Sequence, residues 1–186
     1  MASTITGGSI LPQTTTVYGT AGKARAFIVA GTEITGGILI TAPTGFEVSK
    51  DGISYGETQI IAGGGTIAET TNYVRLKATQ EVGSYSGNIV LSSTGAVSLN
   101  VQVPSSTISK APVVITADDL TKNIGDNDPI LTFKSTGFKN SETERVFITQ
   151  PTLSTTAVTD SPAGQYPITV SGAVATNYDF TYVSGK

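Results

Sequence analysis

The sequence predicts a mostly β protein with two domains in tandem, and three observations carry this prediction. The 186 residues are rich in Thr, Ser, Val and Ile and include 21 Gly, a composition that favours pleated strands and tight turns. Short runs alternate between apolar and polar residues, whereas no long segment has a helical period. Two prolines, Pro104 and Pro112, bracket a polar run, as in a short linker or a strand that crosses between modules. We therefore place the boundary near Ser106, which gives domains at residues 1–106 and 107–186.

Alternating runs in the first half predict a β-sandwich, because short strands separated by turns every ten residues or so are typical of that fold. The clearest run is NYVRLKAT, in which Val74, Leu76 and Ala78 share one face. Successive side chains of a strand point to opposite faces, so this apolar set predicts a buried side. Four other runs predict the same pattern, with Phe27 and Val29, Ile38 and Ile40, Ile89 and Leu91, and Leu99, Val101 and Val103 as their apolar residues.

The second half is predicted to be mostly β with one short helix, which leaves a β-grasp-like fold open. KNSETERVFI is the stretch that predicts a helical turn or two. Ser141 is placed to cap it, and Glu142 and Glu144 fall near the positive end of the helix dipole. The strands of this half are predicted from VVITADD, ILTF, PTLSTTAV, QYPITVSG and NYDFTYV.

Composition excludes several classes of function. The sequence contains no Cys and no His, which excludes disulfides, thiolate and imidazole metal sites, Cys nucleophiles and His general bases. A net charge of −3, with no run of Lys and Arg, argues against a nucleic-acid partner. Charged residues amount to only 13% of the chain, about half the globular average. Low charge with abundant Thr and Ser is typical of an extracellular bacterial protein.

The sequence also bears on export. No stretch approaches the length of a membrane span, and MASTITGG lacks the basic and apolar regions of a signal peptide. We therefore expect this chain to be a fragment of a longer exported protein, located outside the cell or on the bacterial surface. On this interpretation Met1 is a cloning start.

Acidic residues cluster around KNIGDNDPILTF. Asp118 and Asp119 precede Asp126 and Asp128 by a segment no longer than a hairpin. Calcium binds about six to eight oxygen atoms from carboxylates, carbonyls and water, so Asp126 and Asp128 are the calcium candidates of this sequence. The run lacks the spacing, the glycine and the closing Glu of an EF-hand loop. The alternative is that both acids accept backbone hydrogen bonds in a turn led by Gly125. We expect the turn, and no cofactor.

Two tyrosines occupy matching positions. EVGSYSGNIVL and DSPAGQYPITV both contain an acid, a turn and Gly-x-Tyr before an alternating strand, which places Tyr85 and Tyr166 at strand starts. In sandwich folds a tyrosine at this position binds backbone upstream of it and fixes a corner. We expect structural roles for both residues.

Catalysis is not expected, because an enzyme without His would depend on facing carboxylates or on Ser with an unusual partner. No such acid pair stands out, and no Gly-x-Ser-x-Gly elbow precedes a helix. Carbohydrate binding is the main alternative to a structural role. It would require exposed aromatic rings, and the candidates are Tyr73 on the polar face of its strand and Tyr55 in a turn.

The first half resembles a known repeat. GGILITAPTGFEVSKDGISYGETQII and TNYVRLKATQEVGSYSGNIVLSSTGA are similar to an immunoglobulin-like repeat of large secreted bacterial proteins. The resemblance extends from about Ile10 to Val103. It implies an immunoglobulin-like β-sandwich for the first domain.

The second half resembles another module. KAPVVITADDLTKNIGDNDP and GQYPITVSGAVATNYDFTY are similar to the MBG-type domain of bacterial adhesin-like surface proteins. That family usually reads T-K-x-Y-G-D-x-D-P, and here Ile124 stands where its tyrosine would be. The resemblance implies modules that recur in arrays as spacers or adhesive units.

MBG-like domains usually continue with one further strand after the last segment that matches here. We therefore expect the second domain to lack its last strand and to expose unpaired backbone. Exposed strand edges invite strand addition from a neighbouring chain, so we expect intermolecular strand pairing at this domain.

These expectations combine into one hypothesis of function. The chain is predicted to supply non-catalytic structural or adhesive modules that space or present an interaction surface. The alternative is a carbohydrate- or protein-binding module attached to a secreted enzyme or adhesin. The partner would be a host protein, a glycan or another protein ligand.

Overall fold

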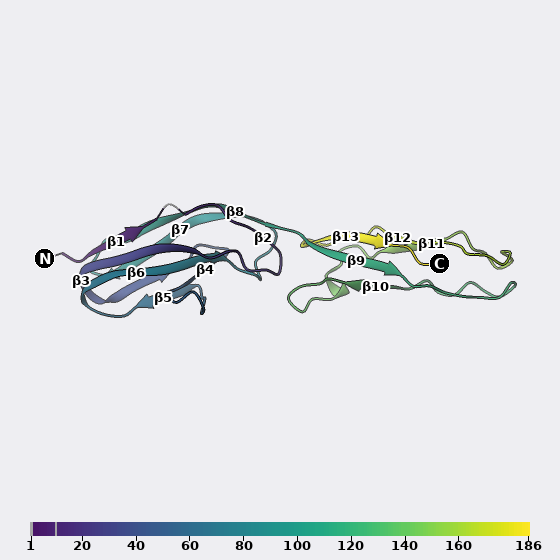
Figure 1. The fold of residues 1–186 in the computed structure, drawn as a ribbon, viewed down its shortest axis with the longest axis horizontal. Helices are drawn as coiled ribbons and strands as arrows, with labels where there is room; N and C mark the ends of the chain where they lie inside the picture. Colours follow the sequence, from purple (N-terminus) through teal and green to yellow (C-terminus); the bar gives the residue numbers. More distant parts are fainter. Residues whose placement is uncertain (1, 10) are drawn as a thin grey trace. The chain divides into compact units, whose positions relative to one another are not determined.

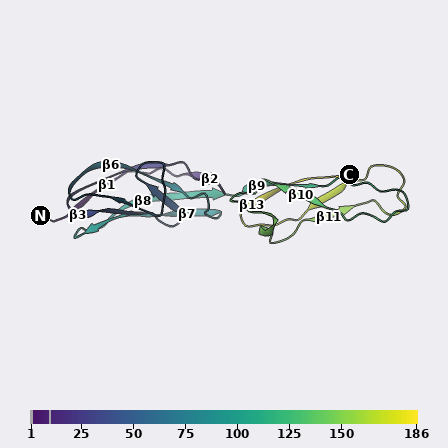
Figure 2. The same ribbon diagram turned by 90° about the horizontal axis from the view of Figure 1, so that it is seen from below.

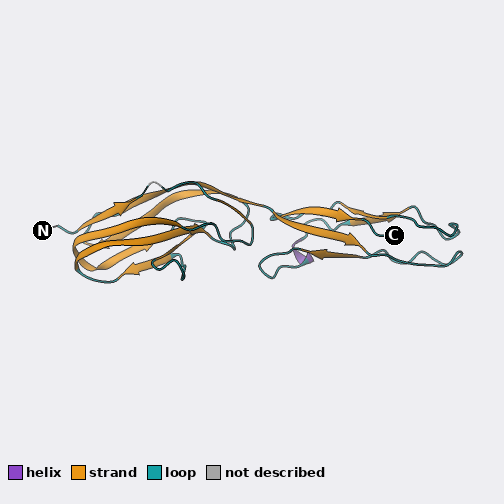
Figure 3. Cartoon of the chain, in the orientation of Figure 1, coloured by secondary structure: helices purple, strands orange, loops and turns teal. Residues whose placement is uncertain are grey.

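Almost all regular structure in the chain is β, as Figure 3 shows. The computed structural model describes residues 2–9 and 11–186. Met1, with its predicted cloning origin, and Ile10, where the immunoglobulin-like resemblance begins, lie outside the described residues. Within those residues, no helix is long and apolar enough to cross a membrane. The mostly β fold class predicted from composition and alternation is confirmed.

Two compact units make up the chain, Met1–Ser109 (unit 1) and Lys110–Lys186 (unit 2). Their boundary lies slightly beyond Ser106, the position that the sequence indicated. The proline-bracketed run is responsible, because it forms strand: β8 (Leu99–Ser109) continues to the end of unit 1, and β9 (Ala111–Ala117) begins directly after Lys110. Each unit is described by itself.

Unit 1 is built from strands that form two sheets sharing a single strand (Figure 1). Their bounds are β1 (Thr4–Gly8), β2 (Thr15–Val17), β3 (Arg25–Thr41), β4 (Phe46–Ser49), β5 (Thr58–Ile61), β6 (Gly65–Leu76), β7 (Gly83–Thr94) and β8. The first sheet has the order β1-β3-β6-β4, and the second has the order β2-β8-β7-β3-β5. This strand order is similar to that of immunoglobulin-type sandwiches, in which strands A, B, E and D form one sheet and C, F and G the other.

The shared strand, β3, bends where it passes from one sheet to the other. Its pairing with β6 ends at Ile34, and its pairing with β7 begins at Thr35, with register shifts on both sides. Gly36 and Gly37 follow at once with φ of 87° and 91°, a conformation that glycine adopts without steric cost. The two glycines and the bulges therefore turn one chain segment into two strands of different sheets.

Most of the apolar residues that alternation predicted lie in the core of unit 1, whereas Ala78 and Leu99 are only half-buried. Phe27, Val29, Ile38 and Ile40 of β3 are fully buried. They pack with buried residues of both sheets, and each such side chain contributes roughly 1.5–3 kcal/mol to the free energy of unfolding. The buried partners on β4, β6, β7 and β8 are Phe46, Val48, Ile67, Val74, Leu76, Ile89, Leu91, Val101, Val103 and Ile108.

Unit 2 contains two small sheets. Its elements are β9, β10 (Phe133–Thr136), the 3-10 turn η1 (Glu144–Val146), β11 (Thr152–Thr155), β12 (Ile168–Ser171) and β13 (Tyr178–Val183). Strand β9 lies between β10, with which it is antiparallel, and β13, with which it is parallel (Figures 1 and 2). Strands β11 and β12 form an antiparallel pair. The core residues of this unit are Ala111, Val113, Ile115, Ala117, Ile168, Val170, Ala173, Ala175 and Tyr178.

The helix predicted around KNSETERVFI is only the single 3-10 turn η1, and its cap is not Ser141. Asn140 and Ser141 have positive φ angles of 52° and 60°, outside the right-handed helical region. Thr143 caps the turn instead, and its side chain accepts a hydrogen bond from the Arg145 N–H. A β-grasp-like sheet would need a longer helix across its face, and the described residues contain none.

Candidate functional site

Asp126 accepts a backbone hydrogen bond in the Gly-led turn, as expected, whereas Asp128 was expected to do the same and binds a lysine side chain instead. The Asp126 carboxylate accepts hydrogen bonds from the backbone N–H of Asn123 at 3.2 Å and from its amide group at 3.0 Å. Gly125 has a φ of 87°, which a residue with a Cβ rarely adopts. Asp128 is bound elsewhere, to the Lys122 ammonium group at 2.5 Å. The two calcium candidates therefore hold different partners.

Asp118 and Asp119 also bind partners of their own. The Asp118 carboxylate accepts a hydrogen bond from the Thr132 hydroxyl at 2.8 Å and lies 3.1 Å from the Lys134 ammonium group. These two contacts, the Thr132 bond first, lower the pKa of Asp118. Asp119 accepts a hydrogen bond from the backbone N–H of Lys186. Among residues 2–9 and 11–186, no three acids converge as metal ligands do.

Lys122 is the central polar residue of this region, and sequence reasoning missed it. Besides the Asp128 carboxylate, its ammonium group binds the carbonyl oxygens of Asp126 at 3.3 Å and Val158 at 2.7 Å. It thereby joins two loops that are far apart in the sequence. A backbone hydrogen bond from the Gly125 N–H to the Thr159 carbonyl joins the same two loops. The only signal in the sequence was a lysine four residues before Asp126, which alone does not identify a tether.

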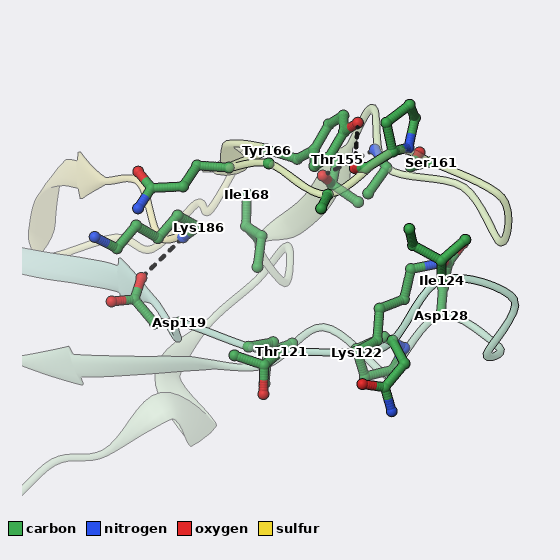
Figure 4. A pocket seen from close by; sticks show the side chains of 18 of the residues that line it. Asp119, Thr121, Lys122, Ile124, Asp128, Thr155, Ser161, Tyr166, Ile168 and Lys186 are labelled. Atoms are coloured by element: carbon green, nitrogen blue, oxygen red, sulfur yellow. Dashed lines mark hydrogen bonds and ion pairs between the residues drawn. The ribbon is translucent and has the colours of Figure 1, made fainter.

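A cleft of about 820 Å³ lies between these two loops. Figure 4 shows Thr121, Lys122 and Ile124 on one wall and Thr155, Tyr166 and Ile168 on the other. Its volume is within the range of ligand-binding pockets. The lining is largely apolar and includes Leu120, Ile124, Pro129, Leu131, Ala157, Pro162, Ala163, Tyr166 and Ile168.

Tyr85 makes the contact expected of a corner tyrosine. Its hydroxyl donates a hydrogen bond to the Glu81 carbonyl oxygen at 3.0 Å and accepts one from the Gln80 side-chain amide. Its ring packs against Gly45, where a Cβ would lie 2.6 Å from the ring. In unit 2, Tyr166 donates to the Pro162 carbonyl, again four residues upstream. The repeated spacing agrees with a structural use of both tyrosines.

Replacement of Tyr85 by Phe is expected to lower the free energy of unfolding of unit 1 by about 1–3 kcal/mol, because it removes the two hydrogen bonds of the hydroxyl, each worth about 0.5–1.5 kcal/mol, and keeps the ring. Thermal denaturation followed by circular dichroism measures the change. The matched control is Tyr166→Phe, which should shift only the transition of unit 2. An unchanged melting temperature for Tyr85→Phe would show that its hydroxyl does not stabilise the corner.

The two tyrosines considered for sugar binding do not form an open aromatic platform. The Arg75 guanidinium group lies 3.5 Å from the ring centroid of Tyr55, so it covers one ring face, and it also binds Glu47 at 2.6 Å. Partial burial raises the pKa of Tyr55, against the opposite effect of the Arg75 charge. Tyr73 packs beside Gly52 of the neighbouring loop. Sugars stack on free ring faces, and this arrangement does not favour that use.

The loop after β4 is organised by Asp51. Its carboxylate accepts hydrogen bonds from the N–H groups of Ile53 and Ser54 and from the Ser49 hydroxyl, each at 2.8 Å. The bond from Ile53 is the largest cause of a pKa of about 2 for Asp51, against an ordinary value of 3.8. The folded state stabilises the charged form of Asp51 relative to the unfolded state. This carboxylate therefore stabilises unit 1 above about pH 4, and the stabilisation is lost as the pH falls towards 2.

The Asp51→Asn variant tests this pH dependence, because Asn accepts similar hydrogen bonds but does not titrate. We expect the melting temperature of unit 1 to fall further in the unchanged chain than in Asp51→Asn when the pH is lowered from about 5 to about 2. Calorimetry at several pH values measures both curves. Parallel curves would show that Asp51 does not contribute to acid sensitivity.

The Gly-led turn, the Lys122 tether and most of the parallel pair of β9 and β13 lie in one segment that a comparison with protein families identifies. Residues 113–186 match the family model of the MBG domain, YGX type. Unit 2 is therefore similar to MBG domains, and the resemblance of KNIGDNDP to that family is supported. No curated protein matches the chain.

The MBG-like unit departs from the family pattern at Ile124. The side chain of Ile124 is 62% exposed, and it lines the cleft where the family's tyrosine would stand. Gly125 keeps the positive φ that the turn requires. Ile124 thus contributes an apolar side chain to the wall of the cleft, directly before the glycine of the turn.

Proposed function

We propose that the chain supplies two non-catalytic structural modules of a larger secreted or cell-surface bacterial protein, which space or present an adhesive element. The match of residues 113–186 to the MBG domain supports this proposal. So does the use of the acids around the turn, since Asp118, Asp126 and Asp128 each hold a structural partner. A spacer at the cell surface must keep its shape under tension between its ends.

The parallel pairing of β9 with β13 is the structural observation that best supports a spacer role. Among the strands of unit 2 that the structure describes, β9 comes first in the sequence and β13 comes last. The register runs from Ala111 opposite Tyr178 to Thr116 opposite Val183. The start of the first strand and the end of the last strand therefore lie at opposite ends of the pair.

This geometry loads the pair in shear. When the two ends of the unit are pulled apart, the force acts along both strands and stretches all of their hydrogen bonds at once. In an antiparallel pair the two ends would lie together, and the bonds would break one after another. Unit 1 has a similar parallel pair, in which β2 pairs with β8 from Thr15 opposite Thr107 to Val17 opposite Ser109.

Force spectroscopy tests the proposal, and the absence of Cys allows defined attachment points. In the first variant, Pro112→Cys with Val183→Cys, the MBG-like unit is pulled along the β9–β13 pair. In the second, Pro112→Cys with Thr136→Cys, it is pulled at the end where β10 closes against β9. Contour length rises by roughly 3.4 Å for each residue released, which identifies the segment that unfolds.

We expect the first variant to unfold at a clearly higher force than the second. Both variants carry the Pro112 substitution, and Thr136 and Val183 are both solvent-accessible, so the direction of pulling is the main difference. Equal forces, or a higher force in the second variant, would overturn a tension-bearing role for this pair. Equal thermal stability of the two variants before attachment is the control.

A further inference from the structure

The loop after β4 contains the dipeptide Asp51–Gly52, which is chemically distinct within this sequence. No other Asp or Asn of the chain is followed by a glycine. When a glycine follows an aspartate, its backbone nitrogen can attack the aspartate side chain, because glycine has no Cβ to obstruct the approach. Both residues are exposed, so water reaches them. The local sequence therefore favours the conversion of Asp51 to isoaspartate.

This conversion proceeds in two steps that conserve all atoms. The Gly52 nitrogen forms a bond to Cγ of Asp51 and gives up its proton, while the C–O bond of the protonated carboxyl group breaks and one water leaves. The resulting succinimide ring then takes up a water at the main-chain carbonyl carbon of Asp51, and the bond from that carbon to the Gly52 nitrogen breaks. The backbone now runs through Cγ and is longer by one methylene group.

The folded loop holds both reacting groups through one buried hydroxyl. Ser49 is the last residue of β4 and is fully buried. Its hydroxyl donates a hydrogen bond to the Asp51 carboxylate at 2.8 Å and accepts one from the Gly52 N–H at 2.9 Å. The Gly52 nitrogen must lose this proton to attack. Its hydrogen bond instead directs the N–H towards Ser49, which opposes the reaction.

The Asp51 carboxylate is also held in its charged form, which does not react. The N–H groups of Ile53 and Ser54 donate to the same oxygen that Ser49 binds, each at 2.8 Å. These bonds, that from Ile53 first, lower the pKa of Asp51 from 3.8 to about 2. Ring closure requires the protonated carboxyl group, from which water can leave. At neutral pH the protonated fraction falls by more than about tenfold, because each pKa unit corresponds to a factor of ten.

We propose that Asp51–Gly52 is a site of spontaneous isoaspartate formation and that the buried Ser49 hydroxyl restrains this reaction in the folded chain. Ser49 is thus a positioning residue for the two reacting groups. Isoaspartate would move the carboxylate away from the N–H groups of Ile53 and Ser54, so the loop would lose the contacts that organise it. The proposal concerns the covalent chemistry of unit 1 and does not depend on the spacer role.

Ageing of the full chain at neutral pH and physiological temperature tests the proposal. Isoaspartate and aspartate have equal mass, and electron-transfer fragmentation of peptides distinguishes them at residue 51. We expect isoaspartate to accumulate at least about tenfold more slowly in the folded chain than in the same chain unfolded in urea. Equal rates in the two conditions, or no isoaspartate at residue 51 in urea, would overturn the proposal.

Two variants of β4 separate the hydroxyl from the general stability of the strand. Ser49→Ala removes both hydrogen bonds, and we expect the rate in the folded chain to rise by about fivefold or more, the factor that corresponds to the loss of one hydrogen bond. Val48→Ala shortens the neighbouring side chain, which is also fully buried, and keeps Ser49, so it should leave the rate unchanged. Equal acceleration in both variants would show that the rate follows a loosening of the strand and that Ser49 has no specific role.

Ser49→Cys keeps the test decisive if Ser49→Ala does not fold. Cys fills nearly the same space but is only a weak hydrogen-bonding group, so we expect the folded Ser49→Cys variant to form isoaspartate faster than the unchanged chain. Circular dichroism establishes that each variant is folded before ageing begins. A rate in folded Ser49→Cys no higher than that of the unchanged chain would overturn the role of the hydroxyl.

Discussion

Replacement of Tyr178 by Ala is expected to lower the free energy of unfolding of the MBG-like unit by about 3–5 kcal/mol. Tyr178 is only 2% exposed, and its ring packs edge-on against Phe138 at a centroid distance of 5.2 Å. Its hydroxyl accepts a hydrogen bond from the Lys139 N–H at 3.0 Å and binds the Glu142 carboxylate. A small unit has little stability to lose, so most of this unit should unfold.

Differential scanning calorimetry of the whole chain measures this effect. The transition of the MBG-like unit should fall by more than about 12 °C or vanish, while that of unit 1 stays in place as an internal control. Tyr178→Phe keeps the ring and removes the hydroxyl, so we expect a loss of only about 1–2 kcal/mol. Equal losses in the two variants would mean that the ring contributes nothing beyond the hydroxyl.

Replacement of Gly45 by Ala is expected to destabilise unit 1 by about 2–5 kcal/mol. Gly45 has a φ of 86°, which costs a residue with a Cβ roughly 1–2 kcal/mol. The new Cβ would also lie 2.6 Å from the ring of Tyr85, and relief of such overpacking costs about 1–3 kcal/mol more. The Tyr85 corner would have to shift.

Gly36 provides a matched control for this prediction. Its φ of 87° is nearly the same, yet a Cβ built there meets no atom within 4 Å. Gly36→Ala should therefore show the conformational cost alone, about 1–2 kcal/mol. Urea denaturation of both variants gives the difference. If Gly36→Ala is as destabilising as Gly45→Ala, the close approach of position 45 to Tyr85 adds nothing to the loss of stability.

Alternation predicted the buried faces well because it reports local geometry. Phe27 and Val29, like Val74 and Leu76, are buried as their period of two requires. The double membership of β3 was not predictable in the same way. Its bend depends on Gly36 and Gly37 adopting positive φ, and glycine is also common in ordinary turns. Only the pairing with β6 and β7, which are distant in the sequence, decides where this strand changes sheet.

The candidate site was predicted only in part, for a related reason. The turn around Asp126 is local, and its Gly-led pattern is visible in the sequence. Lys122 acts through Val158 in a loop far along the chain, so no local pattern indicates its role. The prediction of Ser141 as a helix cap was wrong for a similar reason. Ser141 has a suitable side chain, but the Tyr178 hydroxyl binds Lys139 and Glu142 and holds residues 139–142 in a turn.

The sharing of β3 between two sheets has a consequence for how unit 1 comes apart. Neither sheet of this unit is complete without β3. In one sheet β3 pairs with β1 and β6, and in the other it pairs with β5 and β7. A partly unfolded form with one sheet intact and the other dissolved would have to break this strand in its middle. Unit 1 should therefore lose its structure in a single cooperative step, without a stable half-folded species.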